Sequence, residues 1–374
     1  MLRVSFVTSL GPLEVPVTKN STGRPRRVTM TDVARRAGVS QSTVSFVLND
    51  RRDVVVAEKT RQRVLAVAAE LDFVPNRAAQ NLRSNSSHLI GVITNGIVSQ
   101  PYAGRIVLGI QQVVQPADYL CLVVDTTDDP DEGDVAVASL IGTNVAAIVY
   151  ASPAPIPLHH SRRLGGTRTL FVNCWPDSGE GGTVIVADEY HGGLAAARAV
   201  FELGHRDVAF LGGYEGEYAC VERHRGFLDA ARAAGIDPAA LPQHYGDYSI
   251  GSGYKLTQQV LARRQRPTAL VCGNDRMAIG SLLAVQALGL ECPGDVSIVG
   301  FDDQPDVADQ VRPGLTTVAL PHLEMGRRAG GLLLDEPSEP IDRVTVPAEL
   351  ITRESLGPPP ARRRRLRHAA ALKS

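Results

Sequence analysis

The sequence has few cysteines, and it lacks the short motifs that mark several large classes of enzyme. Its five cysteines are widely spaced and form no CxxC pair, which argues against zinc and disulfides and fits a reducing cytoplasm. No GxSxG or GxxxxGK[ST] sequence occurs, and the nine histidines lack carboxylate or cysteine partners at metal-ligand spacing. We therefore expect no enzyme activity, no metal and no cofactor.

A secretory signal is also missing, because no sustained apolar stretch follows a positively charged start. Glycine and proline punctuate residues 1–27, which we expect to form a disordered leader. Residues 357–374 begin with Gly-Pro-Pro-Pro and continue with arginines and no acid, without leucine heptads. This composition predicts a disordered basic tail and gives no sign of a coiled coil. We expect a cytoplasmic protein without membrane contact.

Positive charge is concentrated in one short part of a chain whose net charge is only −1. Residues 24–83 hold twelve arginines and lysines against six acidic residues, so the remainder of the chain is net acidic. Local basic charge of this kind supplies salt-dependent affinity for the phosphates of nucleic acid. A solvated charged face would not require such segregation.

Within the basic segment, residues 29–49 predict two short helices around a glycine turn. Thr29 and Asp32 stand at the spacing of a capping box, and Gly38 suits the left-handed residue that ends a helix. Ser40 is a good N-cap for a second helix over residues 41–48. This is the outline of a helix-turn-helix, which places its second helix in the DNA major groove.

Two further helices are expected beyond the turn. Residues 58–73 predict a third helix with Ala57 as a poor N-cap. Its apolar residues, Val64, Leu65, Ala68, Leu71 and Phe73, are expected to close the core of the head. Residues 75–83 predict a helix too short to be stable alone, which suits a switch element that forms only with a partner.

The runs DVARRAGVSQSTVSFVLN and ELDFVPNRAAQNLR, with ITRES at residues 351–355, closely resemble the LacI/GalR family of repressors over residues 28–355. The resemblance implies that the second helix reads the major groove. It also implies that paired hinge helices enter the minor groove, where Leu82 would wedge between base pairs; the alternative for Leu82 is a core contact. The residues expected to contact DNA are Thr29, Ser40, Gln41, Ser42, Thr43, Ser45, Phe46, Asn49, Asn76, Arg77, Gln80 and Leu82.

Phe46 departs from the family, because many members carry a hydrogen-bonding side chain at this position. A phenylalanine ring has no donor or acceptor for a base edge. It can contact a thymine methyl group, or it can pack against the third helix. The operator sequence therefore cannot be taken over from other members.

After residue 88 the chain alternates apolar strands with helical segments, which predicts parallel β/α winding. About 270 residues suit two lobes rather than one. The resemblance to periplasmic-binding-protein-like domains implies three crossings between the lobes, near Asp188, Thr317 and Val346. The expected fold is thus an all-α head joined to a two-lobed α/β effector domain.

Several polar residues stand where predicted strands end, and ligands of open α/β sheets bind at such ends. In the family, positions matching Asn173, Arg223, Asn274 and Asp302 line the effector cleft. Asparagine and aspartate are also common turn formers, and the aromatic residues could equally serve packing. The expected effector contacts are Asn95, Tyr102, Asn173, Trp175, Arg223, Asn274 and Asp302, with Asp188 as a further candidate. Such a set suits a sugar or a nucleobase.

We therefore predict a ligand-responsive transcriptional regulator, commonly a repressor, that binds an operator in double-stranded DNA as a homodimer on the bacterial nucleoid. The alternative is a periplasmic-type binding protein or hydrolase with an appended DNA-binding head. The expected parts are a leader (1–27), a helix-turn-helix head (28–74), a hinge helix and linker (75–87), a two-lobed effector-binding and dimerisation domain (88–356) and a basic tail (357–374).

Overall fold

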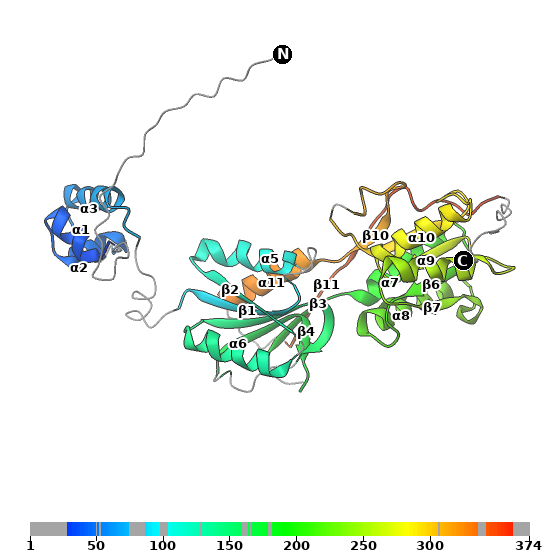
Figure 1. Cartoon of the computed structure of the whole chain (residues 1–374), viewed down its shortest axis with the longest axis horizontal. Coiled ribbons are helices and arrows are strands. Elements are labelled where there is room, and N and C mark those ends of the chain that lie inside the picture. The colour runs from blue at the N-terminus through cyan, green and yellow to red at the C-terminus, as the bar shows by residue number, and fades with distance from the viewer. Residues whose placement is uncertain are drawn as a thin grey trace, which may run out of the picture. The chain divides into compact units, whose positions relative to one another are not determined.

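The chain divides into two compact units, Met1–Ser86 and Ser87–Ser374, which are drawn in Figure 1. The computed structural model describes residues 28–49, 51, 54–74, 87–97, 104–127, 129–158, 164, 166–178, 182–305, 307–335 and 342–361. The predicted leader, the predicted hinge helix and most of the predicted tail lie outside the described residues.

The first unit contains three helices, and local capping fixes where they begin. They are α1 (Met30–Ala37), α2 (Gln41–Leu48) and α3 (Glu58–Glu70). Thr29 and Asp32 form the predicted capping box, and Gly38 ends α1 with a φ of 67°. The Ser40 hydroxyl accepts a 3.1 Å hydrogen bond from the backbone N–H of Thr43 and so begins α2. These predictions are confirmed.

The core of the first unit is small and aliphatic. Its buried side chains come from all three helices: Val33, Ala34, Ala37, Val44, Val47, Val64 and Ala68. Ala57 precedes α3 without a side-chain cap, as predicted. Leu65 is 47% exposed, so the expectation that it closes the core is wrong. Val64 and Ala68 share one helical face, and Leu65 lies about 100° around the helix from Val64.

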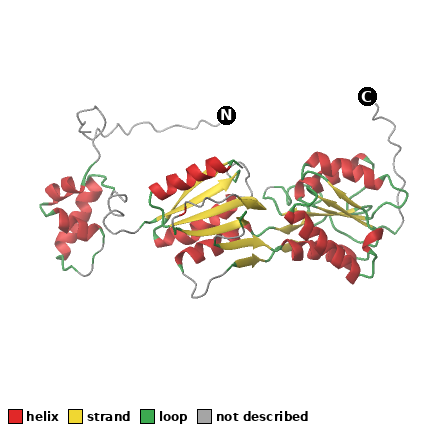
Figure 2. Ribbon diagram, turned by 90° about the horizontal axis from the view of Figure 1, so that it is seen from below, coloured by secondary structure: helices red, strands yellow, loops and turns green. Residues whose placement is uncertain are grey.

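The second unit consists of two lobes, each built on a six-stranded sheet with helices on both faces (Figure 2). In the first lobe the sheet order is β11-β5-β4-β3-β1-β2, and every pairing is parallel. Its elements are β1 (Leu89–Asn95), α5 (Gly104–Val114), η1 (Gln115–Ala117), β2 (Leu120–Thr126), α6 (Pro130–Gly142), β3 (Ala147–Leu158), β4 (Arg168–Pro176), β5 (Thr183–Ala187), α11 (His322–Leu334) and β11 (Arg343–Val346).

In the second lobe the sheet order is β12-β10-β9-β8-β6-β7, and only the edge strand β12 runs antiparallel to its neighbour. Its elements are α7 (Glu189–Glu202), β6 (Val208–Gly212), α8 (Tyr218–Ala233), η3 (Pro238–Ala240), β7 (Gln243–Tyr245), α9 (Ile250–Leu261), β8 (Ala269–Cys272), α10 (Asp275–Ala287), β9 (Ser297–Asp302), β10 (Thr316–Ala319) and β12 (Glu349–Ile351). The predicted fold class is confirmed.

The chain crosses between the lobes at three places. One crossing lies between β5 and α7 at Asp188, and one between β11 and β12, just after Val346. The remaining crossing follows β10, so it lies at Leu320, three residues beyond the predicted Thr317. The Leu320 side chain packs against the cores of both lobes.

Glycines bring helix pairs into unusually close contact in both lobes. A Cβ atom added at Gly326 of α11 would lie 2.1 Å from the carbonyl oxygen of Ile106 on α5. The same distance separates a Cβ at Gly280 of α10 from the carbonyl oxygen of Ile250 on α9. Since a methyl group cannot fit there, these positions require glycine. Among the described helices, none is both long and apolar enough to cross a membrane.

Candidate functional site

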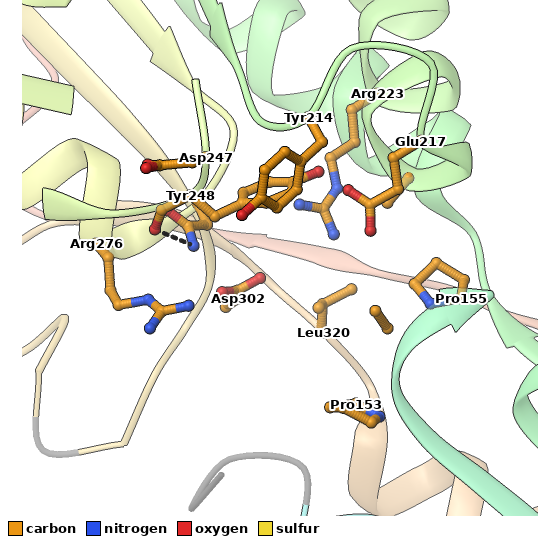
Figure 3. A pocket seen from close by; sticks show the side chains of 13 residues that line it. Pro153, Pro155, Tyr214, Glu217, Arg223, Asp247, Tyr248, Arg276, Asp302 and Leu320 are labelled. Carbon is orange, nitrogen blue, oxygen red and sulfur yellow. Dashed lines mark hydrogen bonds between the residues drawn. The ribbon is translucent and has the colours of Figure 1, made fainter. Parts of the chain in front are cut away.

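A cavity of about 250 Å³ lies at the carboxyl ends of the central strands of the second lobe. The chain leaves β6 toward β7 on one side, while β8 leads to β9 on the other, so this is the topological switch point of the sheet. The first lobe contributes Pro153, Ala154 and Pro155. The second lobe and the crossing contribute Tyr214, Glu217, Ala219, Arg223, Asp247, Tyr248, Asn274, Arg276, Asp302 and Leu320 (Figure 3).

Arg223 is the most deeply buried cation of this cavity. Its helix begins at Tyr218, so Arg223 lies in the second turn of α8. Its Nε donates to Glu189 at 2.7 Å and its Nη1 donates to the carbonyl oxygen of Gly273 at 2.6 Å. Its guanidinium lies 3.8 Å from the centre of the Phe301 ring. Burial alone would lower the pKa of Arg223, but Glu189 together with other acidic groups around it, Asp302 among them, more than offsets this, so the side chain stays charged.

Asn274 serves two purposes at once. Its Oδ1 accepts from the backbone N–H of Met277 at 2.9 Å, which caps α10, and its Nδ2 donates to the carbonyl oxygen of Tyr248 at 3.2 Å. It also lines the cavity. The turn-forming and ligand-facing interpretations of Asn274 are therefore compatible.

Asp302 ends β9 with a left-handed φ of 110°, and it accepts a 3.1 Å hydrogen bond from Gln304. Behind it, Asp275 accepts from the Thr317 hydroxyl at 2.6 Å and from the Gln304 backbone N–H at 2.8 Å. Burial raises the pKa of both carboxyl groups, and Arg223 opposes the rise at Asp302. The pair is thus poised to hold a proton more readily than surface carboxyls do.

Five polar or charged residues of the lining were not predicted from the sequence: Tyr214, Glu217, Asp247, Tyr248 and Arg276. The Tyr248 hydroxyl and Oε2 of Glu217 are buried, and within the described residues neither has a hydrogen-bond partner beyond their interaction with each other. Burial raises the pKa of Tyr248. Buried polar atoms with so few partners indicate a place for ligand groups. Strand β7 has only three residues, and a longer apolar pattern there would have drawn attention to Asp247 and Tyr248, which follow it closely.

The structure places Asn173 and Trp175 outside this cavity. Asn173 is buried with a φ of 57°, and its Nδ2 donates to the carbonyl oxygen of Ser152 at 3.2 Å. Trp175 contacts Tyr218 edge to face, with 5.1 Å between ring centres. Asp188 caps α7 by accepting from the backbone N–H of His191 at 3.0 Å, and it too lies outside the cavity.

Asn95 lines a second cavity of about 370 Å³ in the first lobe. This cavity lies at the carboxyl ends of β1, β2 and β3 beside the first turn of α6, with Thr94, Thr126, Thr127 and Tyr150 among its walls. It occupies the switch point of the first sheet, between β1 and β3. Tyr102 lies outside the described residues.

The predicted DNA-reading residues lie on and around α2. Gln41, Ser42 and Asn49 are exposed, whereas Thr43, Ser45 and Phe46 are half-buried. Ser40 and Thr29 are occupied as helix caps, although both are exposed. Among the described side chains that pack against the core of the head, Phe46 does not occur, which favours the DNA-facing alternative for its ring. Asn76, Arg77, Gln80 and Leu82 lie outside the described residues.

Two family models match this chain. Residues 29–76 match the bacterial regulatory proteins of the lacI family, and residues 197–356 match the periplasmic binding protein-like domain. The HTH-type transcriptional repressor PurR of Proteus mirabilis is 33% identical over 338 residues, which cover 89% of this chain and 98% of the relative. PurR of Erwinia tasmaniensis is 32% identical over 339 residues, with the same coverage.

Solved structures of similar fold include the Lac repressor dimer bound to operator and the anti-inducer ONPF. It superposes with a TM-score of 0.73 at 28% identity, covering 88% of this chain and 99% of that chain. The complex of the transcriptional regulator CelR with cellobiose superposes with a TM-score of 0.59 at 28% identity, covering 88% and 100%. The similarity therefore spans both units of the chain.

Proposed function

This chain belongs to the LacI family of bacterial regulatory proteins, and on that premise we propose how its parts divide the work. It is a ligand-responsive, DNA-binding transcriptional regulator of the repressor type. We assign operator recognition to the head (28–74) and hinge (75–87), and effector binding and dimerisation to residues 88–356. We assign no function to the leader (1–27) or the tail (357–374).

The effector site is the cavity around Arg223, Asn274 and Asp302. This assignment is supported by their convergence at the switch point with two buried polar atoms, on Glu217 and Tyr248, that have no partner beyond each other within the described residues. A cavity of about 250 Å³ is below the usual range of ligand pockets, which begins at about 300 Å³, so the effector is small. Three carboxylates and the Asn274 amide beside two tyrosines suit a sugar-like or nucleobase-like molecule.

The DNA-binding surface is the exposed side of α2 with its flanking residues. Gln41, Ser42 and Asn49 are exposed at positions suited to contact base edges, and Phe46 offers an apolar contact to a thymine methyl group. Thr29 and Ser40 lie at helix N-termini, where backbone N–H groups favour phosphate. Thr43 and Ser45 complete the surface on α2, while Asn76, Arg77, Gln80 and Leu82 extend it into the hinge. The Lac repressor relative is a dimer bound to operator, which supports a homodimer here.

Coupling between the effector site and the DNA-binding head runs through the segments that cross between the lobes. The effector cavity includes Leu320, which lies at one crossing. It also includes Arg223, which is paired with Glu189 beside the crossing at Asp188. Effector binding alters how the lobes close, and closure changes the spacing of paired heads on DNA. Such coupling is reciprocal, so operator DNA must change effector affinity by the same factor.

We also propose that the chain catalyses no reaction and works in the cytoplasm on nucleoid DNA. Its relatives are named as repressors, which supports this assignment. A hydrolase hidden in the lobes would consume the compound that it binds. Turnover of a stabilising compound by purified protein would therefore contradict the proposal.

A thermal-shift screen of sugars and nucleobases tests the effector site. A true effector should raise the unfolding midpoint of wild-type protein and should fail to do so for Tyr248→Ala, whose cavity wall is lost. An equal rise in both proteins would place the compound elsewhere. DNA binding is tested by gel shift with the region upstream of its own gene, which should weaken steeply with salt.

A further inference from the structure

Glu189 is a buried carboxylate on the first turn of α7, directly after the Asp188 crossing between the lobes. Its Oε2 accepts the Nε–H of Arg223 at 2.7 Å, and the two side chains are only 1% and 6% exposed. A buried ion pair gains stability from good geometry and from hydrogen bonds to its remaining polar groups. Here the carbonyl oxygen of Gly273 accepts from Nη1 of Arg223, and the Phe301 ring covers the guanidinium face. Oε1 of Glu189 is buried and has no hydrogen-bond partner within the described residues, so Arg223 is the partner that holds this carboxylate.

The pair changes what charge the effector cavity presents. The charged groups that line it are the carboxylates of Glu217, Asp247 and Asp302 and the guanidinium groups of Arg223 and Arg276. Figure 3 shows the Arg223 guanidinium directed toward the cavity. Because Glu189 already neutralises it, the remaining cation is Arg276, which is exposed. The described lining thus offers acidic groups and no buried cation without a counter-ion.

An anionic ligand would therefore meet an unfavourable environment. To bind Arg223 it would have to compete with Glu189, and displacing Glu189 would leave a carboxylate buried without its partner. Truncating or displacing one member of a buried pair is far more costly than forming the pair is favourable. A neutral ligand with hydroxyl or N–H donors meets no such obstacle, since Glu217 and Asp302 accept its hydrogen bonds.

We propose that Glu189 is a specificity-determining residue that restricts the effector to uncharged molecules, such as neutral sugars, and rejects their phosphates and carboxylic acids. This inference rests on the proposed effector site. Glu189 acts through Arg223: it fixes the direction of the guanidinium and cancels its charge. Replacing Glu189 with glutamine keeps the shape of the side chain but frees the charge of Arg223.

The test uses sulfate as the anionic probe and the full-length chain. Unfolding is followed by the fluorescence of Trp175, which is the only tryptophan and lies in the second unit. Sulfate is compared with sodium chloride at equal ionic strength. For E189Q the midpoint should rise by about 2–4 °C in sulfate, as expected when an anion binds the folded state only. The double variant E189Q/R223M should lose this rise, which separates binding at Arg223 from general salt effects.

Wild type should respond to sulfate like E189Q/R223M, and so should E189D, which keeps the negative charge. The proposal is overturned if sulfate raises the unfolding midpoint of wild type but not that of E189Q/R223M. This comparison does not depend on whether E189Q alone folds stably. The proposal is equally overturned if E189Q responds no more than the double variant. Failure of every neutral sugar to stabilise wild type would count against the proposed effector site, yet would leave the sulfate comparison unchanged.

Discussion

Arg343 on β11 donates a 2.8 Å hydrogen bond to the hydroxyl group of Tyr218 on α8, and this bond joins the first lobe to the second. The Tyr218 ring also contacts Trp175 at the end of β4. The three side chains therefore form one polar and aromatic contact across the lobes, beside the Glu217 wall of the cavity.

This contact can be followed by tryptophan fluorescence, because Trp175 is the only tryptophan. We expect Tyr218→Phe to leave the emission unchanged, since the ring remains, and to reduce the free energy of unfolding by less than about 1 kcal/mol, since Arg343 is exposed. Tyr218→Ala should move the emission to longer wavelengths as water reaches the indole. Identical spectra for the two variants would contradict the contact.

The close approach of α5 and α11 predicts opposite outcomes for two glycines on one helix. Gly326→Ala would place a methyl group 2.1 Å from the backbone oxygen of Ile106, and we expect a loss of about 2 kcal/mol or more in the free energy of unfolding. A Cβ atom at Gly331 would meet nothing within 4 Å, so Gly331→Ala should gain about 0.5–1 kcal/mol from helix propensity. Urea unfolding of both variants provides the measurement, and a neutral Gly326→Ala would argue against the tight crossing.

The missing cap of α3 predicts a stabilising substitution in the head. Ala57 has an extended backbone at the N-cap position but no side chain that can accept a hydrogen bond. Ala57→Ser should stabilise α3 by about 1 kcal/mol, which would slow hydrogen exchange of its amides about fivefold. Thr29→Ala removes the cap of α1 and serves as the converse control, with faster exchange in that helix. Unchanged hydrogen exchange in α3 of Ala57→Ser and in α1 of Thr29→Ala would show that the N-cap hydrogen bond does not limit local unfolding of these helices.

The raised pKa of Asp302 predicts how stability depends on pH. Since burial raises this pKa above that of the unfolded chain, the folded state holds the proton more tightly, and stability falls as pH rises from about 4 toward the folded pKa. Asp302→Asn should remove part of this loss of stability with rising pH. It should therefore raise the thermal unfolding midpoint of the ligand-free protein at neutral pH, while weakening effector binding. Thermal unfolding at pH 4–8 checks this, with the exposed Asp309→Asn as the control for a lost charge. Parallel pH profiles for wild type and Asp302→Asn would contradict it.

Much of the head could be predicted because its determinants are local. The Thr29–Asp32 capping box and the Gly38 turn each depend on residues within one helical turn, so the printed sequence is enough to place them. Asn274 and Asp302 were found for a related reason, because each is a polar residue that follows a short apolar strand. Arg223 lies in the second turn of α8, and the family resemblance indicated it. The side chain of Leu65 was misplaced because an exposed helical leucine looks like a core leucine in sequence.

The remaining site residues depend on contacts between distant segments. Glu189 lies 34 positions before Arg223, and only the packing of α7 against α8 brings them together. Tyr248 and Asp247 follow β7, whose three residues are too few to give a strand pattern. The crossing at Leu320 was predicted three residues early because β10 carries the chain onward within the second lobe. These features follow from topology rather than from local preference.

We propose above all that a ligand in the Arg223, Asn274 and Asp302 cavity controls the affinity of the protein for DNA. The most direct measurement is a fluorescence anisotropy titration of operator DNA with wild type and Asp302→Ala, with and without a compound that stabilises wild type. We predict that the compound changes the DNA Kd of wild type by about tenfold or more, and that of Asp302→Ala by less than about twofold, with equal Kd values in its absence. An undiminished response of Asp302→Ala to the compound would contradict the account.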